Sequence, residues 1–416
     1  MNRAKFKKRA LPFFGLLNLV CFVIFGSIIY ADFVLPDNFN VYKGNALKIS
    51  GIVPISAKAD TQTASGKIIG NDSEQSYMVN INAFGIIPVK QAQVSVIDDS
   101  SVCLLGTPFG IKIYTDGVML VGIDDVDTDS GNRSPANEAG LKVGDLILSI
   151  NGQKVYSNEE VAEIIEKSNG GELKFIIERN GSNLTLTLKP LISYSSGKYR
   201  AGIWVRDSSA GVGTLTFYSP ALKVMCGLGH GICDIDTGEL LTVNSGELVG
   251  AEILGIQKGA SGNPGELKGR FTDSTYGKLI KNNEAGVYAD CEMEEKNGSL
   301  IKIALKQEAE VGKAKIYCTV DQNSGSQLYD CEIKKIAYNN SVTKNMVIHI
   351  TDSKLLEKTG GIVQGMSGSP IIQNGKMIGA VTHVLVDDPT TGFAIFAENM
   401  LNEAKTVSKK SEKSVS

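Results

Sequence analysis

Hydrophobic and polar positions divide the chain into stretches with different periods. Leu11–Ala31 is an apolar run without charges, and it follows a basic cluster of Arg3, Lys5, Lys7, Lys8 and Arg9. At ~1.5 Å per helical residue, a run of this length can cross the ~30 Å hydrocarbon core of a bilayer. Basic flanks stay cytoplasmic. The pattern therefore predicts a membrane-spanning helix, with everything after Asp32 outside the cytoplasmic membrane.

A cleaved signal peptide is the alternative interpretation of the same run. Its apolar core usually has ~7–15 residues and ends at a small-residue A-x-A site. The run here is longer, and the sequence near Ala31 lacks a clean A-x-A pattern, so the anchor is favoured. The stretch from Asp32 to about Gly70 is polar without a sustained period and is predicted to be a tether. Tyr77–Ile97 contains short strand-like runs.

The period changes again between about Ser100 and Pro190. Leu146–Ile150 is predicted to be a strand, Glu159–Lys167 has helical spacing, and a hairpin is expected about Asn180-Gly181. The string Ser134–Ile147, with its A-G-L-K-V-G-D-L-I run, resembles a PDZ domain. In PDZ domains a peptide adds as a strand at a sheet edge, and loop N–H groups hold its carboxylate. Two loops could supply these groups: Leu104-Leu105-Gly106 and Gly117-Val118.

Short strand-like runs alternate with glycine-rich turns over residues 200–400, and few stretches have helical spacing. Many short strands with turn residues between them are typical of a β-barrel or sandwich. The last residues, Ala404–Ser416, are polar and are expected to fray.

Composition adds limits on function. The chain has 416 residues, enough for two or three domains, and a net charge of −3, which gives no reason to expect nucleic-acid binding. There are seven cysteines: Cys21 lies in the apolar run, and the others are Cys103, Cys226, Cys233, Cys291, Cys318 and Cys331. An exported chain can pair cysteines, but the sequence does not give the connectivity, and free buried thiols are an equal expectation.

The segment Gly365-Met366-Ser367-Gly368-Ser369-Pro370 carries the chemistry. A serine hydroxyl becomes a nucleophile when a base takes its proton and donors hold the oxyanion that forms. A tight turn with glycines leaves the Ser367 Oγ accessible and lets the backbone N–H groups of Gly365 and Ser367 point to one place. This pattern is typical of the nucleophile turn of a chymotrypsin-like serine peptidase.

The base must be one of three histidines. His230 has a glycine on each side, His349 lies in an alternating strand, and His383 is close to Ser367 in sequence. His230 is favoured as the base, and His383 and His349 stay as alternatives. The third member orients the imidazole. Asp352, fifteen residues before Ser367, is one candidate, and chain order alone favours two others. The further acidic candidates are Asp234, Asp236, Asp273, Asp290, Asp321 and Asp330, of which Asp273 and Asp290 are those favoured by order.

Four segments closely resemble the SpoIVB peptidases, the stage IV sporulation protein B family: Gly202–Asp207, Gly213–Thr216, Leu228–His230 and Gly360–Pro370. These are membrane-anchored, PDZ-bearing serine peptidases of endospore-forming bacteria. The resemblance implies His230 as base, Ser367 as nucleophile and Asp352 as acid. It further implies that the enzyme is secreted into the space between the forespore membranes, cleaves itself, and cuts a regulator of an intramembrane protease, so that a sigma factor is activated.

The predicted fold class is mainly β, with an N-terminal transmembrane helix, an α+β PDZ domain and a chymotrypsin-like β-barrel peptidase domain. The predicted boundaries are 1–31 for the basic stub and membrane segment, 32–99 for the tether with short β segments, 100–190 for the PDZ domain, 191–403 for the peptidase domain and 404–416 for the polar tail. The expected partners are protein or peptide substrates, the chain's own tether and the membrane. No metal or organic cofactor is implied.

Two other interpretations remain. Cys226, His230 and Cys233 have a spacing that zinc accepts, which would make His230 a ligand in a zinc-stabilised domain and leave Ser367 without its base. Alternatively, the chain is a non-catalytic PDZ receptor in which the serine turn is only a tight turn. Metal analysis and a Ser367→Ala variant distinguish these interpretations from a peptidase.

Overall fold

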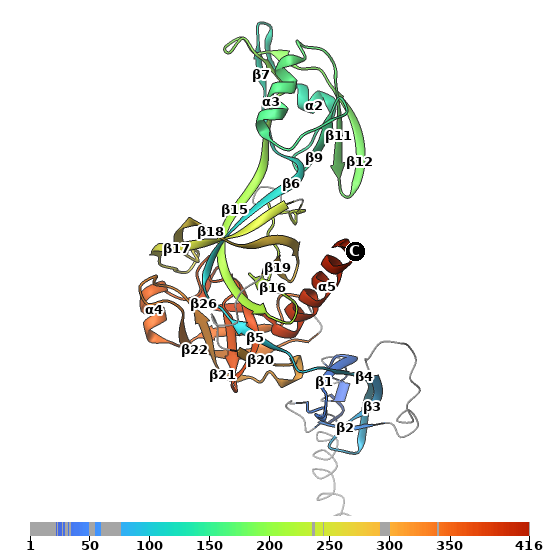
Figure 1. Ribbon diagram of the computed structural model, residues 1–416, viewed down its shortest axis with the longest axis vertical. Coiled ribbons are helices and arrows are strands. Elements are labelled where there is room, and N and C mark those ends of the chain that lie inside the picture. Colours follow the sequence, from blue (N-terminus) through green and yellow to red (C-terminus); the bar gives the residue numbers. More distant parts are fainter. Residues whose placement is uncertain are drawn as a thin grey trace, which may run out of the picture.

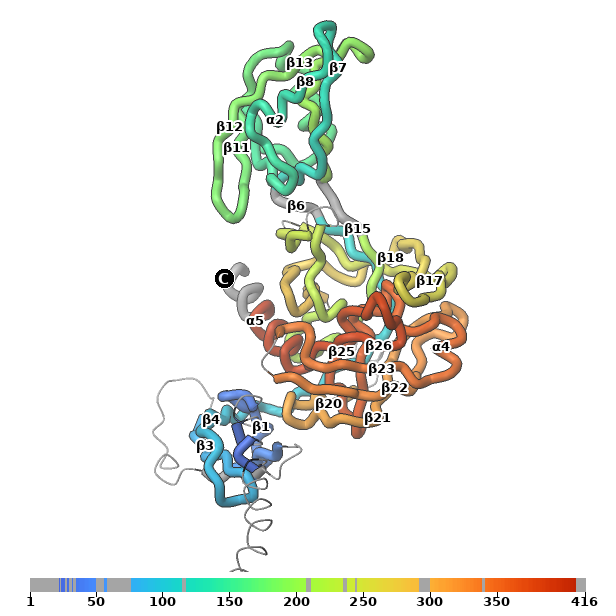
Figure 2. Tube along the Cα trace, turned by 180° about the vertical axis from the view of Figure 1, so that it is seen from behind, coloured from blue at the N-terminus to red at the C-terminus, as the bar shows by residue number. Residues whose placement is uncertain are grey.

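Three bodies lie in a row in the computed structural model, with a central β domain between an N-terminal sheet and a PDZ-like domain (Figures 1 and 2). The structure describes residues 22, 24–26, 28–29, 32, 35–49, 55–59, 76–234, 238–243, 245–291, 300–338 and 341–415. The predicted membrane segment, Leu11–Ala31, lies for the most part outside these residues. Among the helices that the structure does describe, none has the length and hydropathy to cross a bilayer.

The N-terminal sheet has four strands in the order β1-β4-β3-β2: β1 (Asn38–Tyr42), β2 (Ile55–Ala59), β3 (Ser76–Ala83) and β4 (Ile87–Ile97). Strand β1 pairs with β4 in parallel, and its alternate residues Phe39 and Val41 are buried against Ile81 and Val94. Part of the predicted tether is therefore an ordered strand. The local pattern does not predict this strand, because its partner β4 lies 55 residues further along the chain (Asn38 pairs with Gln93).

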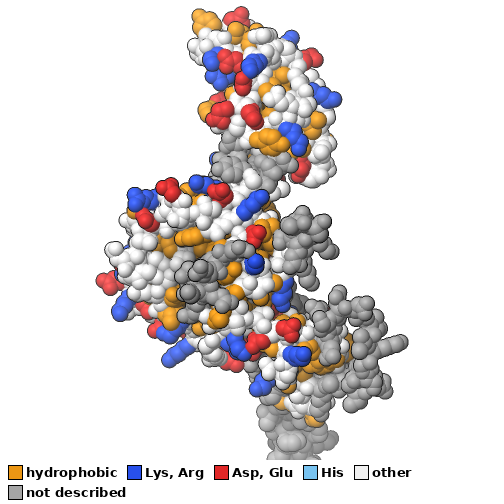
Figure 3. All heavy atoms as spheres, in the orientation of Figure 1, with side chains coloured by type: hydrophobic (Ala, Val, Ile, Leu, Met, Phe, Trp, Pro, Cys, Tyr) orange, Lys and Arg blue, Asp and Glu red, His pale blue; other side chains and the backbone are white. Residues whose placement is uncertain are grey.

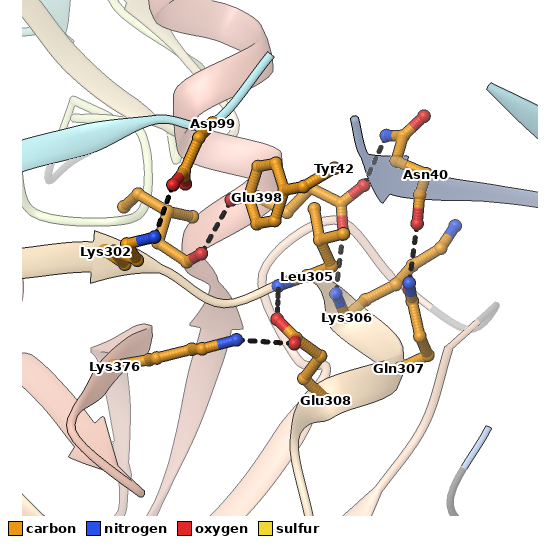
Figure 4. A network of polar contacts seen from close by, with 11 residues as sticks. Asn40, Tyr42, Asp99, Lys302, Leu305, Lys306, Gln307, Glu308, Lys376 and Glu398 are labelled. Atoms are coloured by element: carbon orange, nitrogen blue, oxygen red, sulfur yellow. Dashed lines mark hydrogen bonds and ion pairs between the residues drawn. The ribbon is translucent and has the colours of Figure 1, made fainter. Parts of the chain in front are cut away.

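A network of polar contacts joins this sheet to the central domain (Figure 4). The Tyr42 hydroxyl donates to the Ile303 carbonyl at 2.6 Å. The Asn40 amide donates to the Glu398 carboxylate at 2.5 Å, and the Gln307 amide donates to the Asn40 carbonyl at 2.6 Å. Glu398 is only 3% exposed. Buried polar groups of this kind keep their partners, so the sheet is fastened to the central domain by specific bonds.

The central domain has two β lobes. The first lobe contains β5 (Ser101–Leu104), β6 (Pro108–Ile123), β15 (Ile203–Ser219), β16 (Val224–Gly227), β17 (Ser245–Gln257), β18 (Glu266–Asn283) and β19 (Gly286–Asp290). Strand β6 pairs with β15 on one side and β17 on the other. The buried side chains of Phe109, Ile111 and Leu248 form part of its core. Residues 101–113 thus belong to this lobe rather than to the PDZ domain, which corrects the boundary expected at residue 100.

The PDZ-like domain is inserted in the chain between β6 and β15. These two long strands pair with each other, and both run from the first lobe into the PDZ-like domain (Figure 1). Its own elements are β7 (Val126–Thr128), β8 (Gly131–Arg133), α2 (Pro135–Ala139), β9 (Leu146–Ile150), β10 (Gln153–Lys154), α3 (Asn158–Lys167), β11 (Leu173–Arg179), β12 (Ser182–Leu188), β13 (Leu191–Ile192) and β14 (Tyr199–Arg200). The predicted strand, helix and hairpin all lie here, and Val161 and Ile165 of α3 are buried in its core.

The second lobe contains β20 (Leu300–Ile303), the 3-10 turn η2 (Lys306–Glu308), β21 (Gly312–Cys318), β22 (Gln327–Ile336), β23 (Met346–Ile350), α4 (Ser353–Thr359), β24 (Pro370–Gln373), β25 (Lys376–Leu385) and β26 (Asp388–Phe396). It has its own core, which includes Ile348, Ile371 and Phe396. Helix α5 (Ala397–Val415) follows. The expected frayed tail is thus in part helical, because Ala404 and Val407 are buried against the domain.

Candidate active site

The segment around Ser367 is a tight turn that leads into β24. Gly365 and Gly368 have φ values of 94° and 95°, a region that L side chains avoid. A Cβ on Gly368 would stand 2.0 Å from the Thr214 carbonyl oxygen and 2.6 Å from the Leu228 nitrogen. Only glycine therefore fits this position.

The two serines of the turn have different surroundings. The hydroxyl of Ser369 is buried and donates to the Met366 carbonyl at 2.6 Å, within the turn itself. Ser367 is partly exposed, and its Oγ donates to the carbonyl of Thr382 at 2.7 Å. Ser369 holds the shape of the turn, whereas the Ser367 hydroxyl lies at the surface where a substrate can reach it.

Strand β15 of the first lobe forms hydrogen bonds to the Ser367 turn, although this turn belongs to the second lobe. The Thr214 N–H donates to the Ser367 carbonyl at 2.9 Å. The hydroxyls of Thr214 and Thr216 donate to the carbonyls of Gly365 and Gly368, each at 2.7 Å. These three hydrogen bonds connect the Ser367 turn to the lobe that carries His230. The sequence shows Thr214 and Thr216 as ordinary strand residues, and their role appears only from the fold.

His230 follows β16, after two residues with left-handed backbone, Leu228 at φ 66° and Gly229 at φ 68°. These residues turn the chain toward the second lobe. A Cβ on Gly229 would lie 3.2 Å from a side-chain atom of Thr382. The His230 Nδ1 is 2.7 Å from the Gly231 carbonyl oxygen. When Nδ1–H donates to this carbonyl, Nε2 is left unprotonated and can accept a proton.

Strand β25 brings the candidate residues together. Thr382 is buried and accepts the Ser367 hydroxyl, and the Val381 carbonyl accepts the Gly368 N–H at 2.7 Å. The next residue, His383, has its ring centroid 4.9 Å from that of His230. Two adjacent residues of β25 therefore contact the candidates: Thr382 bonds to Ser367, and His383, the alternative base, lies against His230, the favoured base.

The predicted oxyanion donors are available. In the part of the chain that the structure describes, the backbone N–H groups of Gly365 and Ser367 donate to no acceptor, whereas the Met366 N–H between them donates to the Val363 carbonyl at 3.1 Å. A backbone N–H without a partner is costly when it is shielded from water. These two groups can offer hydrogen bonds to an oxygen that carries developing charge.

Asp352 is placed differently from the expectation. It is the N-cap of α4, and its Oδ1 accepts from the N–H groups of Lys354 and Leu355 at 2.9 and 3.0 Å. Its Oδ2 accepts from the Asp330 N–H at 3.2 Å. It lies five residues beyond Val347, which is in register with His383 through β26. At ~3.3 Å per residue of strand, this is roughly 16 Å further along. The structure thus does not bring Asp352 to His230.

None of the other acidic candidates that the structure describes is bonded to His230. Asp330 pairs with Lys315 and Asp321 with Lys358. Asp273 and Asp290 are exposed on β18 and β19, and Asp236 lies outside the described residues. Asp234 is 2% exposed and forms an ion pair with Arg206 at 2.8 Å. Across the described residues, no carboxylate is hydrogen-bonded to His230.

His349 does not join the site. Its Nδ1 lies 3.1 Å from the Thr391 hydroxyl on the paired strand β26. His349 therefore has a structural role, in keeping with its place in an alternating strand.

The role of Asp352 as the N-cap of α4 predicts how substitutions at this residue affect stability. Asparagine caps helices about as well as aspartate, whereas alanine at an N-cap costs about 1 kcal/mol. We therefore expect Asp352→Asn to leave the free energy of unfolding nearly unchanged and Asp352→Ala to lower it by about that amount, as measured by denaturant unfolding. The activity of the folded Asp352→Asn variant then tests the acid role separately. A loss near 10⁴-fold, of the size known for a missing triad carboxylate, would show that Asp352 reaches His230 during turnover.

Burial sets the acid–base properties of His230. Loss of solvent around the ring lowers its pKa, and the hydrogen bond to the Gly231 carbonyl opposes this only in part. The imidazole is consequently neutral at pH 7 and ready to accept a proton. Burial also lowers the pKa of His383, with the nearby His230 and Lys344 acting in the same direction.

The lowered pKa of His230 predicts the acid limb of the pH profile. A general base works only when it is unprotonated, so activity falls as pH drops through its pKa. A lowered pKa moves this fall below the ordinary histidine value of ~6.5. We therefore expect the midpoint of the acid limb of kcat/KM to lie below pH 6.5. An acid limb centred above pH 7 would contradict this assignment.

The cysteines near His230 are not arranged as a ligand set. Cys226 is buried in a hydrophobic cluster, and burial raises the pKa of its thiol well above the usual value. Cys233 is exposed and its backbone pairs with Leu240. Over the residues that are described, no group of three or more histidine, cysteine or acidic side chains is placed to bind a metal ion.

The two loops considered for the PDZ carboxylate site lie elsewhere. Leu104-Leu105-Gly106 ends β5 in the first lobe, and a Cβ on Gly106 would meet Tyr317 of the second lobe at 2.6 Å. Gly117-Val118 lies within β6, where Val118 pairs with Ile147. Neither is a free loop, and this part of the expectation is wrong.

Comparisons with known proteins agree with the architecture. Residues 197–401 match the SpoIVB peptidase S55 family, and residues 126–179 match the PDZ domain. The probable protease eep of Enterococcus faecalis is 38% identical over 86 residues, which are 20% of each chain. The serine protease HTRA1 of Xenopus laevis is 44% identical over 57 residues, 14% of this chain and 12% of that protein.

The chain thus spans 20% or less of the length of these two curated relatives. A solved protease from M. tuberculosis in its active form is 15% identical, with a TM-score of 0.29, and the match covers 48% of this chain and 74% of that one. The serine turn, His230, strands β15 to β19 of the first lobe and strands β20 to β26 of the second lobe lie within the matched peptidase region, and elements β7 to β11 of the inserted body lie within the matched PDZ region. The chain therefore belongs to the SpoIVB peptidase S55 family and carries a PDZ domain within its first β lobe.

Proposed function

We propose that this protein is a serine endopeptidase tethered to the cytoplasmic membrane, with its catalytic part outside. The observation that carries the proposal is that adjacent residues of β25 contact the two candidates: the Thr382 carbonyl accepts the Ser367 hydroxyl, and the His383 ring lies 4.9 Å from that of His230. A nucleophile, a neutral imidazole and two free backbone donors in one place are the parts that acyl transfer needs.

The reaction follows from these parts. The Ser367 Oγ attacks the carbonyl carbon of the scissile peptide bond, and His230 takes the hydroxyl proton at Nε2. The N–H groups of Gly365 and Ser367 hold the oxyanion. His230 then gives its proton to the leaving amine, and water attacks the acyl-enzyme in a second round. In the resting conformation the Ser367 hydroxyl donates to the Thr382 carbonyl, so it must rotate toward the imidazole when substrate binds.

The biological role proposed here rests on the family and on the charge pattern of the N-terminus. The basic cluster and Leu11–Ala31 hold the chain in the membrane. By family, the enzyme acts between the two forespore membranes, cleaves its own N-terminal tether and then cuts a regulator of an intramembrane protease. Activation of a sigma factor during sporulation follows. Its partners are thus protein substrates and the membrane.

Self-cleavage and anchoring are tested together. Full-length wild type and Ser367→Ala are expressed, separated into membrane and soluble fractions, and the N-termini of all products are sequenced by mass spectrometry. We expect intact Ser367→Ala in the membrane fraction and shortened wild-type products that begin after Asp32. A soluble Ser367→Ala protein that begins near residue 32 would mean a cleaved signal peptide instead. Identical products from both proteins would mean that another protease makes the cuts.

Excising the PDZ domain tests its part in choosing the cut. Removal of residues 100–190 would also remove β5 and the whole of β6, including the part of β6 that pairs within the first lobe. Strands β6 and β15 are antiparallel, with Tyr114 opposite Ser208, so a short turn that replaces residues 117–205 keeps the lobe intact. We expect this variant to cleave a generic peptide at a similar rate but to cut its own tether at different sites or more slowly. Wild-type sites and rates in the excised variant would assign the PDZ domain to an external substrate or partner.

A further inference from the structure

Two of the three histidines in the chain face each other across the lobes. The rings of His230 and His383 are 4.9 Å apart between centroids and tilted by 36°. This distance and tilt describe two rings in offset contact rather than two nitrogens joined edge to edge. The His383 ring is therefore in contact with the imidazole that we propose as the base.

The backbone that carries His383 also carries the nucleophile. The Thr382 carbonyl accepts the Ser367 hydroxyl, and Val381 exchanges bonds with the turn through the Gly368 and Ser369 backbone, at 2.7 and 3.0 Å. His383 comes directly after these two residues on β25. Its position relative to Ser367 is thus fixed by main-chain bonds, and any contact it makes with His230 sets the distance between base and nucleophile.

The His230 ring needs a contact that fixes its orientation. Its only hydrogen bond from the ring within the described residues joins Nδ1 to the Gly231 carbonyl, which is the next residue in the chain. One bond to an adjacent residue fixes which nitrogen is protonated but leaves the ring plane free to swing. A carboxylate usually limits this motion, and none of the described carboxylates is bonded to His230. Contact with a second ring is the restraint that the structure offers in its place.

The charge of His383 matters because His230 becomes a cation during turnover. Lys344 is the nearby charged side chain: it lies over Phe393, 5.2 Å from the ring centroid, and Phe393 pairs with His383 across β25 and β26. Lys344 and burial both favour the uncharged form of His383. An uncharged neighbour can stack on the imidazolium without repelling it.

We propose that His383 is a positioning residue of the peptidase, which holds the ring plane of His230 through contact between the two rings. The proposal rests on the proposed function, since it assigns a role to His383 only if His230 is the base. Its effect should appear in kcat rather than in KM, because the ring contact acts on the proton transfer and not on substrate binding.

Three substitutions at His383 in the full-length protein separate ring contact from charge. His383→Phe keeps a ring that cannot be protonated, His383→Ala removes the ring, and His383→Lys places a fixed charge beside His230. We expect kcat of His383→Ala to fall roughly 10- to 100-fold with KM nearly unchanged, since small misplacements of reacting groups cost about this much. His383→Phe should recover most of the loss. In His383→Lys, the positive neighbour should lower the pKa of His230 and move the acid limb of kcat/KM to lower pH.

The controls separate a failure of this proposal from a failure of the proposed function. Ser367→Ala and His230→Ala must be inactive; if either keeps wild-type activity, the peptidase site itself is wrong. If both are inactive and His383→Ala has the kcat of wild type, only the positioning role is overturned. If His383→Phe is as slow as His383→Ala, ring contact is not the cause and the proposal again fails. His349→Ala is the matched histidine control and should leave kcat unchanged. If His383→Ala does not fold, the comparison of His383→Phe with wild type and the pH profile of His383→Lys decide.

Discussion

Replacing Ser367 by alanine is expected to abolish peptide-bond cleavage, with a loss in kcat of about 10⁶-fold, the size found when the nucleophile of a serine protease is removed. The side chain is partly exposed, and its one hydrogen bond in the described residues goes to the Thr382 carbonyl. The fold therefore has little dependence on it, and the free energy of unfolding should stay within about 1 kcal/mol of wild type. Steady-state kinetics on a generic peptide measure the first effect and denaturant unfolding the second.

Ser369 is the matched control for this prediction. Its buried hydroxyl donates to the Met366 carbonyl, so Ser369→Ala should lower stability by roughly 1 kcal/mol and reduce activity only as far as the turn loosens. The opposite pattern, in which Ser369→Ala is dead and Ser367→Ala is active, would move the nucleophile to Ser369 and overturn the assignment of the site.

Alanine at Gly368 should have the largest effect on the architecture of the site. The new Cβ would stand 2.0 Å from the Thr214 carbonyl oxygen and 2.6 Å from the Leu228 nitrogen, and both are backbone atoms that cannot rotate away. The residue also has φ 95°. We expect stability to fall by about 3 kcal/mol or more, as overpacking and backbone strain each cost 1–3 kcal/mol, and activity to be lost because β15, the turn and the Leu228-Gly229 bend all move.

Gly375 offers a control with the same kind of backbone and no crowding. Its φ is 73°, and a Cβ there would meet nothing within 4 Å. Gly375→Ala should therefore cost only about 1–2 kcal/mol for the left-handed backbone and leave kcat unchanged. If Gly368→Ala proves no worse than Gly375→Ala in both stability and activity, the close approach of β15 to the turn is not needed.

Strand β15 contributes residues both to the PDZ core and to the contacts around the Ser367 turn. Strand β15 has Ile203 and Val205 packed against the PDZ core and Thr214 bonded to the nucleophile turn. Between them, Arg206 forms its ion pair with buried Asp234, in the segment that follows His230. A single strand thus runs from the PDZ core to the turn that carries Ser367.

The sequence predicted the parts of the site whose chemistry is local. The glycines around Ser367 and His230 indicate tight, open turns, because glycine can adopt positive φ without a steric penalty, whatever its neighbours are. The PDZ elements could be predicted for the same reason: Asn151-Gly152 is a turn, and the helix Asn158–Lys167 has apolar residues at helical spacing. These features depend on neighbours only a few positions away.

Contacts between distant segments could not be predicted. Strand β1 depends on β4, β5 depends on β15 and β20, and Thr214 meets a turn some 150 residues later. The same limit affects Asp352. Its place before Ser367 in the family pattern favours a catalytic role, but the start of α4 gives its carboxylate three backbone partners. A residue type and a spacing do not show which of two possible partners a side chain will take.

The amino-acid sequence by itself determined that the chain is mainly β, that it contains a PDZ domain, and that Ser367 and His230 are the candidates for nucleophile and base. Only the tertiary structure decided that the PDZ domain is inserted between β6 and β15, that Thr214 and Thr382 bond to the serine turn, and that the rings of His383 and His230 lie 4.9 Å apart. The physical reason is range: backbone preferences and hydrophobic periods are set by adjacent residues, whereas strand pairing and ring contact are set by which distant surfaces are buried together.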